Sequence, residues 1–230
     1  MRQKWHDLLF MHWPVPASAL RPLIPRALEL DSFNGECWVG VVPFRMTGVR
    51  FRGLPPIPGT SAFCELNVRT YVTADGKPGV WFFSLDAAIA AAVTAAWRWF
   101  HLPYFRARMS LRESRGIVQY ESRRTQRRAS SAEFRGKYWP ASEPFTAQRG
   151  ALEHFLVERY CLYAEARGKI YRGEIDHAPW PLQTAEAEME ANSMAQASHI
   201  ELPPTAPLLH FSKVQDVRVW PLARVQTRSG

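Results

Sequence analysis

Lysine is scarce in this chain. Only five of its 29 basic residues are lysines, and the rest are arginines. The five are Lys4, Lys77, Lys137, Lys169 and Lys213, and each lies in a polar or turn-like stretch. An enzyme that works through a Schiff base needs a primary amine whose pKa is lowered, for example by a desolvating pocket. No lysine here has such a context, so we expect no lysine-dependent imine chemistry.

Cysteine and long apolar runs are also scarce. The three cysteines (Cys37, Cys64 and Cys161) are widely spaced and odd in number, which favours free thiols in a reducing cytoplasm over disulfides. The seven histidines show no metal-ligand spacing, and we expect neither a metal nor a cofactor. The N-terminus lacks a secretory apolar region, and no segment reaches the roughly 20 apolar residues of a membrane span. We therefore expect a cytoplasmic protein without a membrane partner.

Several motifs are missing as well. The chain has no Gly-x-Ser-x-Gly elbow, no phosphate-binding loop and no dinucleotide fingerprint, so hydrolase-elbow and nucleotide-fold readings have no support. It also has no internal repeat and no Ser/Gly-rich linker. With 230 residues, 47% of them hydrophobic, it can bury a substantial core. We expect one domain over residues 1–230.

The most informative segment spans residues 80–105. It is typical of a buried strand, then an alanine-rich helix, then a stop at Pro103. Ser84 is placed to cap this helix, and Asp86 lies where its first turn would favour a carboxylate. From residue 85 to 96 only Asp86 and Thr94 are polar, so nearly every face of the helix avoids water. The pattern predicts a central helix surrounded by sheet.

Most of the remaining chain predicts strands. Tight turns are expected at Asn34-Gly35, Arg115-Gly116 and Arg167-Gly168, each between two strand-like stretches. In residues 65–72 polar and apolar side chains alternate, which directs one polar face towards a cavity. Residues 185–197 are rich in alanine and glutamate and predict a helix. The fold class is therefore α+β and mostly antiparallel β, with a closed or two-layer sheet around the central alanine-rich helix.

Several segments resemble known families. Residues 13–31, residues 63–72 (Phe-Cys-Glu-Leu-Asn-Val-Arg-Thr-Tyr-Val) and the segment ending in Leu102-Pro103-Tyr104 resemble the acetoacetate decarboxylase-like superfamily in order and position. Residues 155–163, 177–182 (His-Ala-Pro-Trp-Pro-Leu) and 217–222 (Val-Arg-Val-Trp-Pro-Leu) are similar to its YqjF-like family. The resemblance covers most of the chain and implies an acetoacetate decarboxylase-like domain.

The resemblance breaks at the residues that carry the decarboxylase reaction. In the decarboxylases the helix ends in Pro-Lys-Lys, and the first lysine forms the Schiff base. Alignment on Pro103 places Tyr104 and Phe105 at the two lysine positions, and neither side chain can form an imine. The pocket arginine of the decarboxylases has no secure match, with His6 the nearest residue by counting. A shared fold therefore does not imply acetoacetate decarboxylase activity.

Candidate catalytic residues are Glu65, Tyr104 and His177. Glu65 falls near the position of a pocket glutamate in the decarboxylases, and desolvation would raise its pKa towards the range of a general acid or base. Tyr104 offers a hydroxyl where the lysine would stand, and His177 can move protons near neutral pH. The structural alternatives are an ion pair of Glu65 with Arg69, a core tyrosine and a structural histidine.

Candidate ligand-binding residues are Arg69, Arg106, Arg108 and Trp180. A guanidinium grips a carboxylate with two hydrogen bonds, and an indole offers a flat apolar wall. Glu158, Arg159 and Tyr160 match a YqjF-like signature but are interpreted as structural. The arginines between residues 106 and 135 supply much of the +8 net charge. They are typical of a solvated hairpin face, with a nucleic-acid surface as the minor alternative, because no recognition module accompanies them.

Two functions remain open. The chain is either a small-molecule binding protein with an aromatic pocket for an anionic or carbonyl-containing ligand, or a lysine-independent enzyme that uses Glu65, Tyr104 or His177 for acid–base chemistry. Whether it is an enzyme does not follow from these residues. A homo-oligomer stays open, because decarboxylase relatives assemble into large oligomers.

Overall fold

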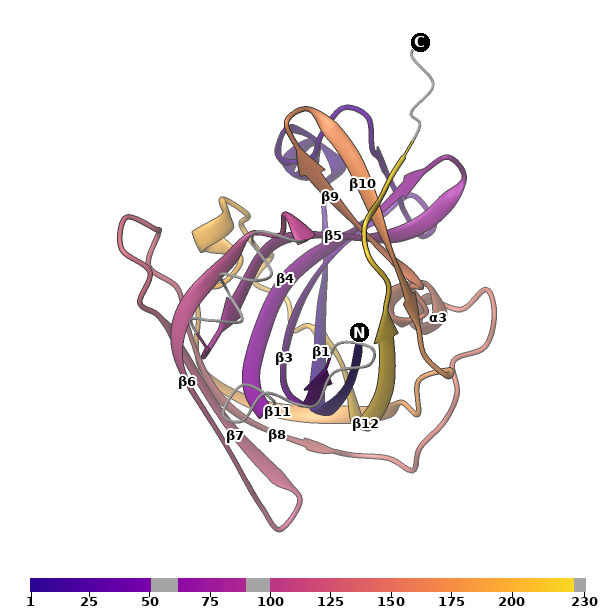
Figure 1. Cartoon of the computed structure of the whole chain (residues 1–230). Coiled ribbons are helices and arrows are strands. Elements are labelled where there is room, and N and C mark those ends of the chain that lie inside the picture. Colours follow the sequence, from indigo (N-terminus) through magenta and orange to yellow (C-terminus); the bar gives the residue numbers. More distant parts are fainter. Residues whose placement is uncertain (51–61, 90–99, 226–230) are drawn as a thin grey trace.

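The computed structural model describes residues 1–50, 62–89 and 100–225. The described chain is mostly β-sheet (Figure 1). Its strands are β1 (Arg2–Val15), β2 (Glu29–Leu30), β3 (Cys37–Arg50), β4 (Ala62–Ala74), β5 (Lys77–Ala87), β6 (Tyr104–Ser114), β7 (Ile117–Arg124), β8 (Glu133–Pro140), β9 (Cys161–Ala166), β10 (Lys169–Asp176), β11 (Gln183–Asn192), β12 (Leu208–Val219) and β13 (Ala223–Arg224). The described α-helices are α1 (Ala17–Leu20) and α3 (Leu152–Val157), and the 3₁₀ helices are η1 (Arg21–Leu23) and η2 (Gln196–Ser198).

The paired strands form two closed rings. One ring runs β5-β6-β7-β8-β11-β12-β1-β3-β4 and closes through the pairing of β4 with β5. The other runs β5-β9-β10-β12-β1-β3-β4 and closes through β10 with β12 and β4 with β5. We call them the nine-strand ring and the seven-strand ring; they share β1, β3, β4, β5 and β12 (Figure 1). Most pairings are antiparallel, whereas β5 pairs in parallel with both β6 and β9.

The predicted tight turns are confirmed. Both residues of each turn have positive φ, a conformation that a hairpin of this type requires and that glycine adopts without steric cost. The turns join β6 to β7, join β9 to β10 and precede β3, and a fourth of the same kind joins β4 to β5. Their residues are Asn34-Gly35, Asp75-Gly76, Arg115-Gly116 and Arg167-Gly168.

Two hydrophobic clusters fill the two rings. The first takes side chains from β7, β8 and the shared strands, among them Val118, Tyr138 and Leu66. The second takes side chains from β9, β10 and the shared strands, among them Leu162 and Phe44. Because successive side chains of a strand point to opposite faces, each shared strand contributes one face to each cluster.

The prediction of a helix that begins at Ser84 is wrong. Ser84 and Asp86 lie in β5, where Asp86 pairs with Leu66 of β4 and Phe105 of β6. Strand structure prevails here because pairing on both sides satisfies the backbone of these buried residues. The rest of the expected helix lies largely outside the described residues; Phe100 is helical and the chain has left the helix by His101. The described part of the chain is therefore mostly sheet, and it does not form a clear α+β fold around a central helix.

The predicted helix at 185–197 is also wrong. Residues Gln183–Asn192 form β11, which pairs with β8 over most of its length. Its glutamates alternate with alanines, so the hydrophobic period is two, and Ala185 and Ala187 pack against the first cluster while Glu186 and Glu188 face solvent. Tertiary pairing outweighs the helix propensity of alanine and glutamate in this segment.

The remaining expectations about small sites can be compared with the described residues. All three cysteines are free thiols, and burial raises the pKa of Cys64 to about 11, which makes it a poor nucleophile. Within residues 1–50, 62–89 and 100–225, no three metal-ligating side chains gather at one place. In the same ranges, no helix has the length and apolar character that a membrane crossing requires.

Candidate functional site

A row of polar side chains on β4 faces the cluster of the seven-strand ring. Glu65, Asn67 and Arg69 alternate along this strand, and their cross-strand neighbours on β3 include the cluster members Phe44 and Val42. All three are buried, with exposed fractions of 4%, 5% and 8%. The sequence pattern predicted a polar face on this strand, and the structure confirms that the face is directed inward. We call Glu65, Asn67 and Arg69 the polar row.

Glu65 forms a hydrogen-bonded pair with Tyr104. The Tyr104 hydroxyl donates to Glu65 Oε2 at 2.8 Å. Burial raises the pKa of Glu65 to about 8, and the charge of Asp86 adds to the rise, while the Tyr104 hydrogen bond opposes it. Near pH 7 the Glu65 carboxyl is therefore largely protonated. Burial and the neighbouring Glu65 together raise the pKa of Tyr104 well above its usual range, so Tyr104 acts as a neutral donor.

Arg69 has no acidic partner among the described residues. Its Nη2 donates to the carbonyl of Leu156 at 3.4 Å, and its Nε is buried without a hydrogen-bond partner among the described residues. The guanidinium lies against aromatic rings instead, 5.5 Å from the Phe10 centroid and 6.0 Å from the Tyr71 centroid. The predicted alternative of a Glu65–Arg69 ion pair is absent from the described residues. A buried cation without a counter-ion is unfavourable unless a ligand supplies one.

His12 lies beside Arg69 and stays neutral. Gly40 separates the two across the sheet, and a Cβ there would come within 3.1 Å of the His12 ring. The Tyr71 hydroxyl donates to the Leu156 carbonyl at 2.8 Å, so it accepts the proton of His12 Nε2 at 2.7 Å. Burial first, and then the charge of Arg69, lower the pKa of His12 well below its usual range. Its Nδ1 is left as a buried acceptor without a described partner.

Trp180 belongs to the same interior. Its ring lies edge-on to Phe10 with centroids 5.0 Å apart and stacks on Trp5 at 6.0 Å. Through Phe10 it is thus linked to Arg69. The indole nitrogens of Trp5 and Trp180 are buried without a described partner, as is Asn67 Oδ1. The interior of the seven-strand ring therefore combines apolar walls with several unsatisfied polar atoms, which is the composition of a small-molecule site.

His177 is buried at the edge of this interior, against Trp180. Its ring stacks on Tyr160 with centroids 4.6 Å apart, and Tyr160 is 37% exposed. The centroids of the His177 and Trp180 rings are 5.2 Å apart, and His177 Nδ1 lies 2.8 Å from the carbonyl of Ala178. Glu158 accepts hydrogen bonds from the Tyr160 hydroxyl and from the Trp180 backbone N–H. These contacts place Trp180 in the interior, and they bring His177 no closer to Glu65.

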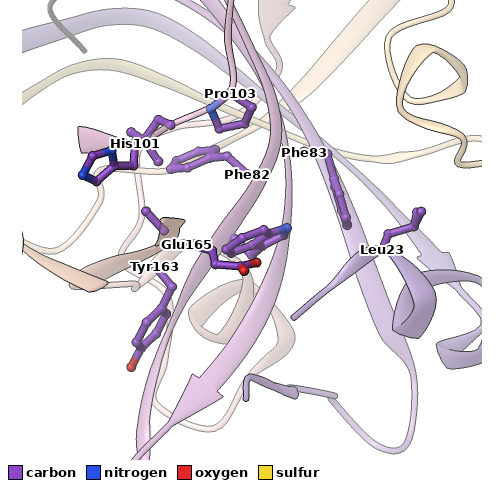
Figure 2. Close-up of a pocket in the computed structure, with 10 residues that line it drawn as sticks. Leu23, Phe82, Phe83, His101, Pro103, Tyr163 and Glu165 are labelled. Atoms are coloured by element: carbon purple, nitrogen blue, oxygen red, sulfur yellow. The ribbon is translucent and has the colours of Figure 1, made fainter. Parts of the chain in front are cut away.

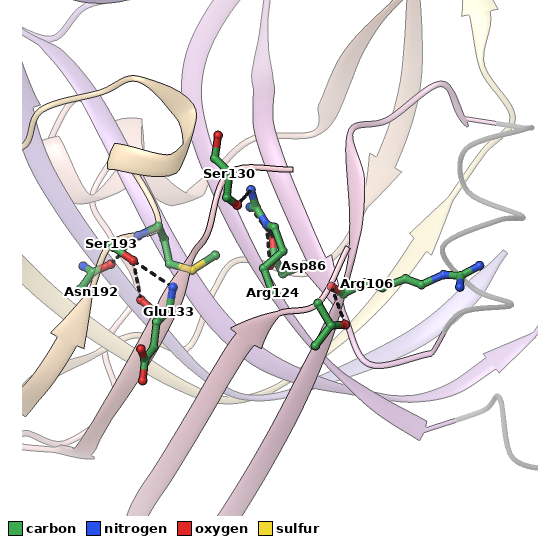
Figure 3. Close-up of polar contacts among 9 residues, drawn as sticks. Asp86, Arg106, Arg124, Ser130, Glu133, Asn192 and Ser193 are labelled. Carbon is green, nitrogen blue, oxygen red and sulfur yellow. Dashed lines mark hydrogen bonds and ion pairs between the residues drawn. The ribbon is translucent and has the colours of Figure 1, made fainter. Parts of the chain in front are cut away.

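The arginine-rich hairpin of β6 and β7 does not place Arg106 or Arg108 at the polar row either. Arg106 and Arg108 are exposed on β6, and Figure 3 shows Arg106 extending away from the neighbouring ion pair. That pair joins Arg124 to Asp86 through bonds of 2.6 to 3.2 Å, with both side chains almost fully buried. In the sequence, Arg124 is one arginine of a charged stretch. Its pairing with Asp86 could not be predicted, because Asp86 lies 38 residues away.

All five lysines lie within the described residues, and none is buried. Lys77 forms an ion pair with Glu174, and Lys213 forms one with Asp7. No amine stands near Glu65 among the described residues. The position next to Glu65 that the resemblance assigned to a lysine is occupied by the Tyr104 hydroxyl.

Comparison with solved structures defines the class of the fold. Acetoacetate decarboxylase from Legionella pneumophila superposes with a TM-score of 0.67 at 12% identity, over 99% of this chain and 88% of that one. The enduracididine biosynthesis enzyme MppR, solved in complex with pyruvate, superposes with a TM-score of 0.65 at 11% identity, over 99% and 91%. The chain thus has an acetoacetate decarboxylase-like fold.

Sequence comparison then identifies the family. The chain is 50% identical over 224 residues to the uncharacterized protein YqjF of Bacillus subtilis (strain 168), which covers 97% of this chain and 92% of the relative. A family model described as "Uncharacterized conserved protein (COG2071)" matches residues 2–216. The chain belongs to this family, DUF2071, and the YqjF-like prediction is confirmed.

Proposed function

We propose that this protein binds a small molecule with a carboxylate and a carbonyl group inside the seven-strand ring. The observation that carries the proposal is Arg69, a buried arginine with no acidic partner among the described residues. The ligand carboxylate would supply the missing counter-ion and accept from Arg69 Nε. The bidentate pairing of guanidinium with carboxylate is among the stronger hydrogen-bonded contacts in proteins.

The carbonyl end of the ligand is assigned to the pair of Glu65 and Tyr104. Protonated Glu65 accepts from Tyr104 on Oε2 and can donate its own proton to an oxygen acceptor. Alternate residues of one strand face lie about 7 Å apart, so the four-residue step from Glu65 to Arg69 covers about 13 Å. The side chains of Glu65 and Arg69 must bridge most of this distance for one small ligand to contact both. The relative solved with pyruvate supports a small keto acid as the first ligand to test.

A lysine-independent acid–base reaction at the same site is the second candidate. It is favoured by the pKa of about 8 at Glu65, which lies in the range where a carboxyl can exchange protons near neutral pH. Glu65→Gln separates the two functions, because the amide preserves shape but cannot transfer a proton. Binding alone predicts that the variant keeps its affinity. An enzyme predicts that deuterium exchange at the methyl group of pyruvate, followed by NMR in D₂O, disappears in the variant.

The first experiment measures thermal stability with pyruvate and acetoacetate, and with acetone as a carbonyl compound that lacks the carboxylate. At about a hundredfold excess over Kd, binding adds about 2.7 kcal/mol, which for a chain of this size raises Tm by about 5 to 10 °C. We expect the rise with the acids, no rise with acetone, and no rise in Arg69→Gln. Arg112→Gln, an exposed arginine of β6, is the matched control and should respond like the parent.

Borohydride is added to the same samples. Because no lysine is buried, we expect no covalent product. Covalent trapping of a keto acid on any of the five lysines would contradict a lysine-free site. An equal Tm rise with acetone, or a full rise in Arg69→Gln, would contradict the role of Arg69.

A further inference from the structure

Strand β5 pairs with two different strands along one of its edges. The place where these two strands diverge is called the fork. Val80 and Trp81 pair with Leu162 and Tyr163 of β9, whereas pairing with β6 begins at Leu85. Over Phe82–Ser84 neither described strand pairs with that side of β5. The divergence of β9 and β6 leaves a cavity of about 500 Å³ at the fork (Figure 2). In open α/β sheets, the crevice where neighbouring strands diverge is a common ligand site.

Three consecutive aromatic residues form the floor of this fork cavity: Trp81, Phe82 and Phe83. Consecutive strand residues face opposite sides, and Phe82 packs against the second cluster while Trp81 and Phe83 pack against the first. The cavity therefore receives side chains from both faces of β5, beside a register shift from Ser84 opposite Val68 to Phe82 opposite Arg69. All three rings are only partly buried. Leu102 and Pro103 complete the apolar wall.

Glu165 is the charged side chain of the fork cavity. It is exposed, and it has no ion pair or side-chain hydrogen bond among the described residues. Glu174 on the next strand differs, because Lys77 and Arg172 both pair with it. In Figure 2, Tyr163 and Glu165 lie across the opening from Phe82 and His101. The rings of His101 and Tyr171 are in contact, with centroids 5.7 Å apart. Among the described residues, His101 forms no ion pair with Glu165.

We propose that the fork cavity is a second binding site, one that takes a compact organic cation carrying an aromatic ring. The ring would pack on the aromatic floor, and the ammonium group would bind Glu165 while lying over aromatic faces. Aromatic faces and a carboxylate together are the arrangement that recognises amines, because both attract positive charge. The volume suits a ligand of this size. Phe82 is the cross-strand neighbour of Arg69, but the cavity lining includes no residue of the polar row, so the inference does not depend on the proposed function.

The test is isothermal titration with 2-phenylethylamine at about pH 8, where an ordinary imidazole is neutral and an alkylamine is still charged. The neutral 2-phenylethanol and the anionic 3-phenylpropionate serve as comparators with the same ring. We expect the amine to bind at least about tenfold more tightly than either comparator, and Glu165→Gln to remove most of that preference. Glu201→Gln changes another exposed glutamate and should leave the preference intact.

Two outcomes would overturn the proposal. Equal binding of the amine and the alcohol would show that Glu165 is not used, and an unchanged preference in Glu165→Gln would place the amine elsewhere. Trp81→Leu keeps an apolar floor but removes the aromatic face, and it should weaken the amine more than the alcohol. A far-ultraviolet circular dichroism spectrum of each variant excludes unfolding as the cause. The response of Glu165→Gln to pyruvate, measured separately, reports on the polar row alone.

Discussion

At the scale of single residues, Glu65 is a buried acid whose pKa is raised to about 8. Its carboxyl is buried in an interior where the nearest cation on the same strand, Arg69, does not pair with it. Its hydrogen-bond donor is a tyrosine 39 residues further along the chain. The sequence placed Glu65 and Tyr104 in separate groups of candidates, because their contact is made only when β6 pairs with β5.

The raised pKa of Glu65 predicts a pH dependence of stability. The carboxyl titrates near 4.3 when unfolded and at about 8 when folded, so the folded state holds a proton that the unfolded state releases. The free energy of unfolding should therefore fall as pH rises from about 5 to 8, by up to about 1.4 kcal/mol per unit. Urea unfolding at several pH values should show this loss in the parent and not in Glu65→Gln. Parallel curves for the two proteins would contradict the raised pKa.

Tyr104→Phe provides a second check on this residue. The Tyr104 hydroxyl holds the pKa of Glu65 down, because its hydrogen bond favours the charged carboxylate. Its removal should shift the pKa of Glu65 further upward, and the loss of stability should then extend to higher pH. An NMR titration of the labelled Glu65 side chain measures this directly. An unchanged pKa would mean that the hydrogen bond is absent in solution.

At the scale of elements, β5 carries one half of a buried ion pair. Asp86 lies on β5 and Arg124 ends β7, and the two join the strands across the nine-strand ring (Figure 3). Both side chains are 2% exposed or less. Loss of one partner leaves the other charge buried and unpaired, which costs about 3 to 5 kcal/mol. The charge of Asp86 is thus accommodated in the interior only together with Arg124, while strand pairing on both sides satisfies its backbone.

A double-mutant cycle tests the role of this pair. We expect Arg124→Met to lower the free energy of unfolding by about 3 to 5 kcal/mol, and Asp86→Asn added to it to restore a large part, because the pair of variants has no buried charge. Arg135→Met breaks an exposed pair with Glu190 and should cost about 1 kcal/mol or less. Additive effects of Arg124→Met and Asp86→Asn would show that the two charges are not coupled.

At the scale of the whole molecule, the two rings cannot separate without breaking shared strands. Five strands contribute to both, and each carries one cluster on either face. We therefore expect the described core to unfold in one cooperative transition. This expectation agrees with the single domain that the sequence predicts, in which no linker divides the chain.

Two substitutions in unshared strands test that cooperativity. Val118→Ala on β7 removes atoms from the first cluster, and Leu162→Ala on β9 removes atoms from the second. The leucine substitution should cost about 2 to 5 kcal/mol, and the valine substitution somewhat less. Both should move one and the same transition in near- and far-ultraviolet circular dichroism. Two transitions, each moved by a different substitution, would indicate that the rings unfold separately.

The sequence by itself determined the features that depend on local chemistry. An Asn-Gly or Arg-Gly pair that lies between two strand-like stretches favours a tight turn, so the turns before β3 and within two hairpins followed from the local sequence. Alternation of polar and apolar side chains identified the inward polar face of β4. The family also followed from the sequence, because its short motifs extend along most of the chain.

Tertiary structure decided everything that depends on partners distant in the chain. Ser84–Ala87 and Gln183–Asn192 have helix-forming residues, yet they are strands because neighbouring strands satisfy their backbone and, for Asp86, its charge. Proximity likewise separated the candidate site residues. It brought Tyr104 to Glu65 and His177 to Trp180, and it left Arg106 and Arg108 exposed. Side-chain spacing along a strand fixes a face, whereas contact across a closed sheet depends on which strands pair.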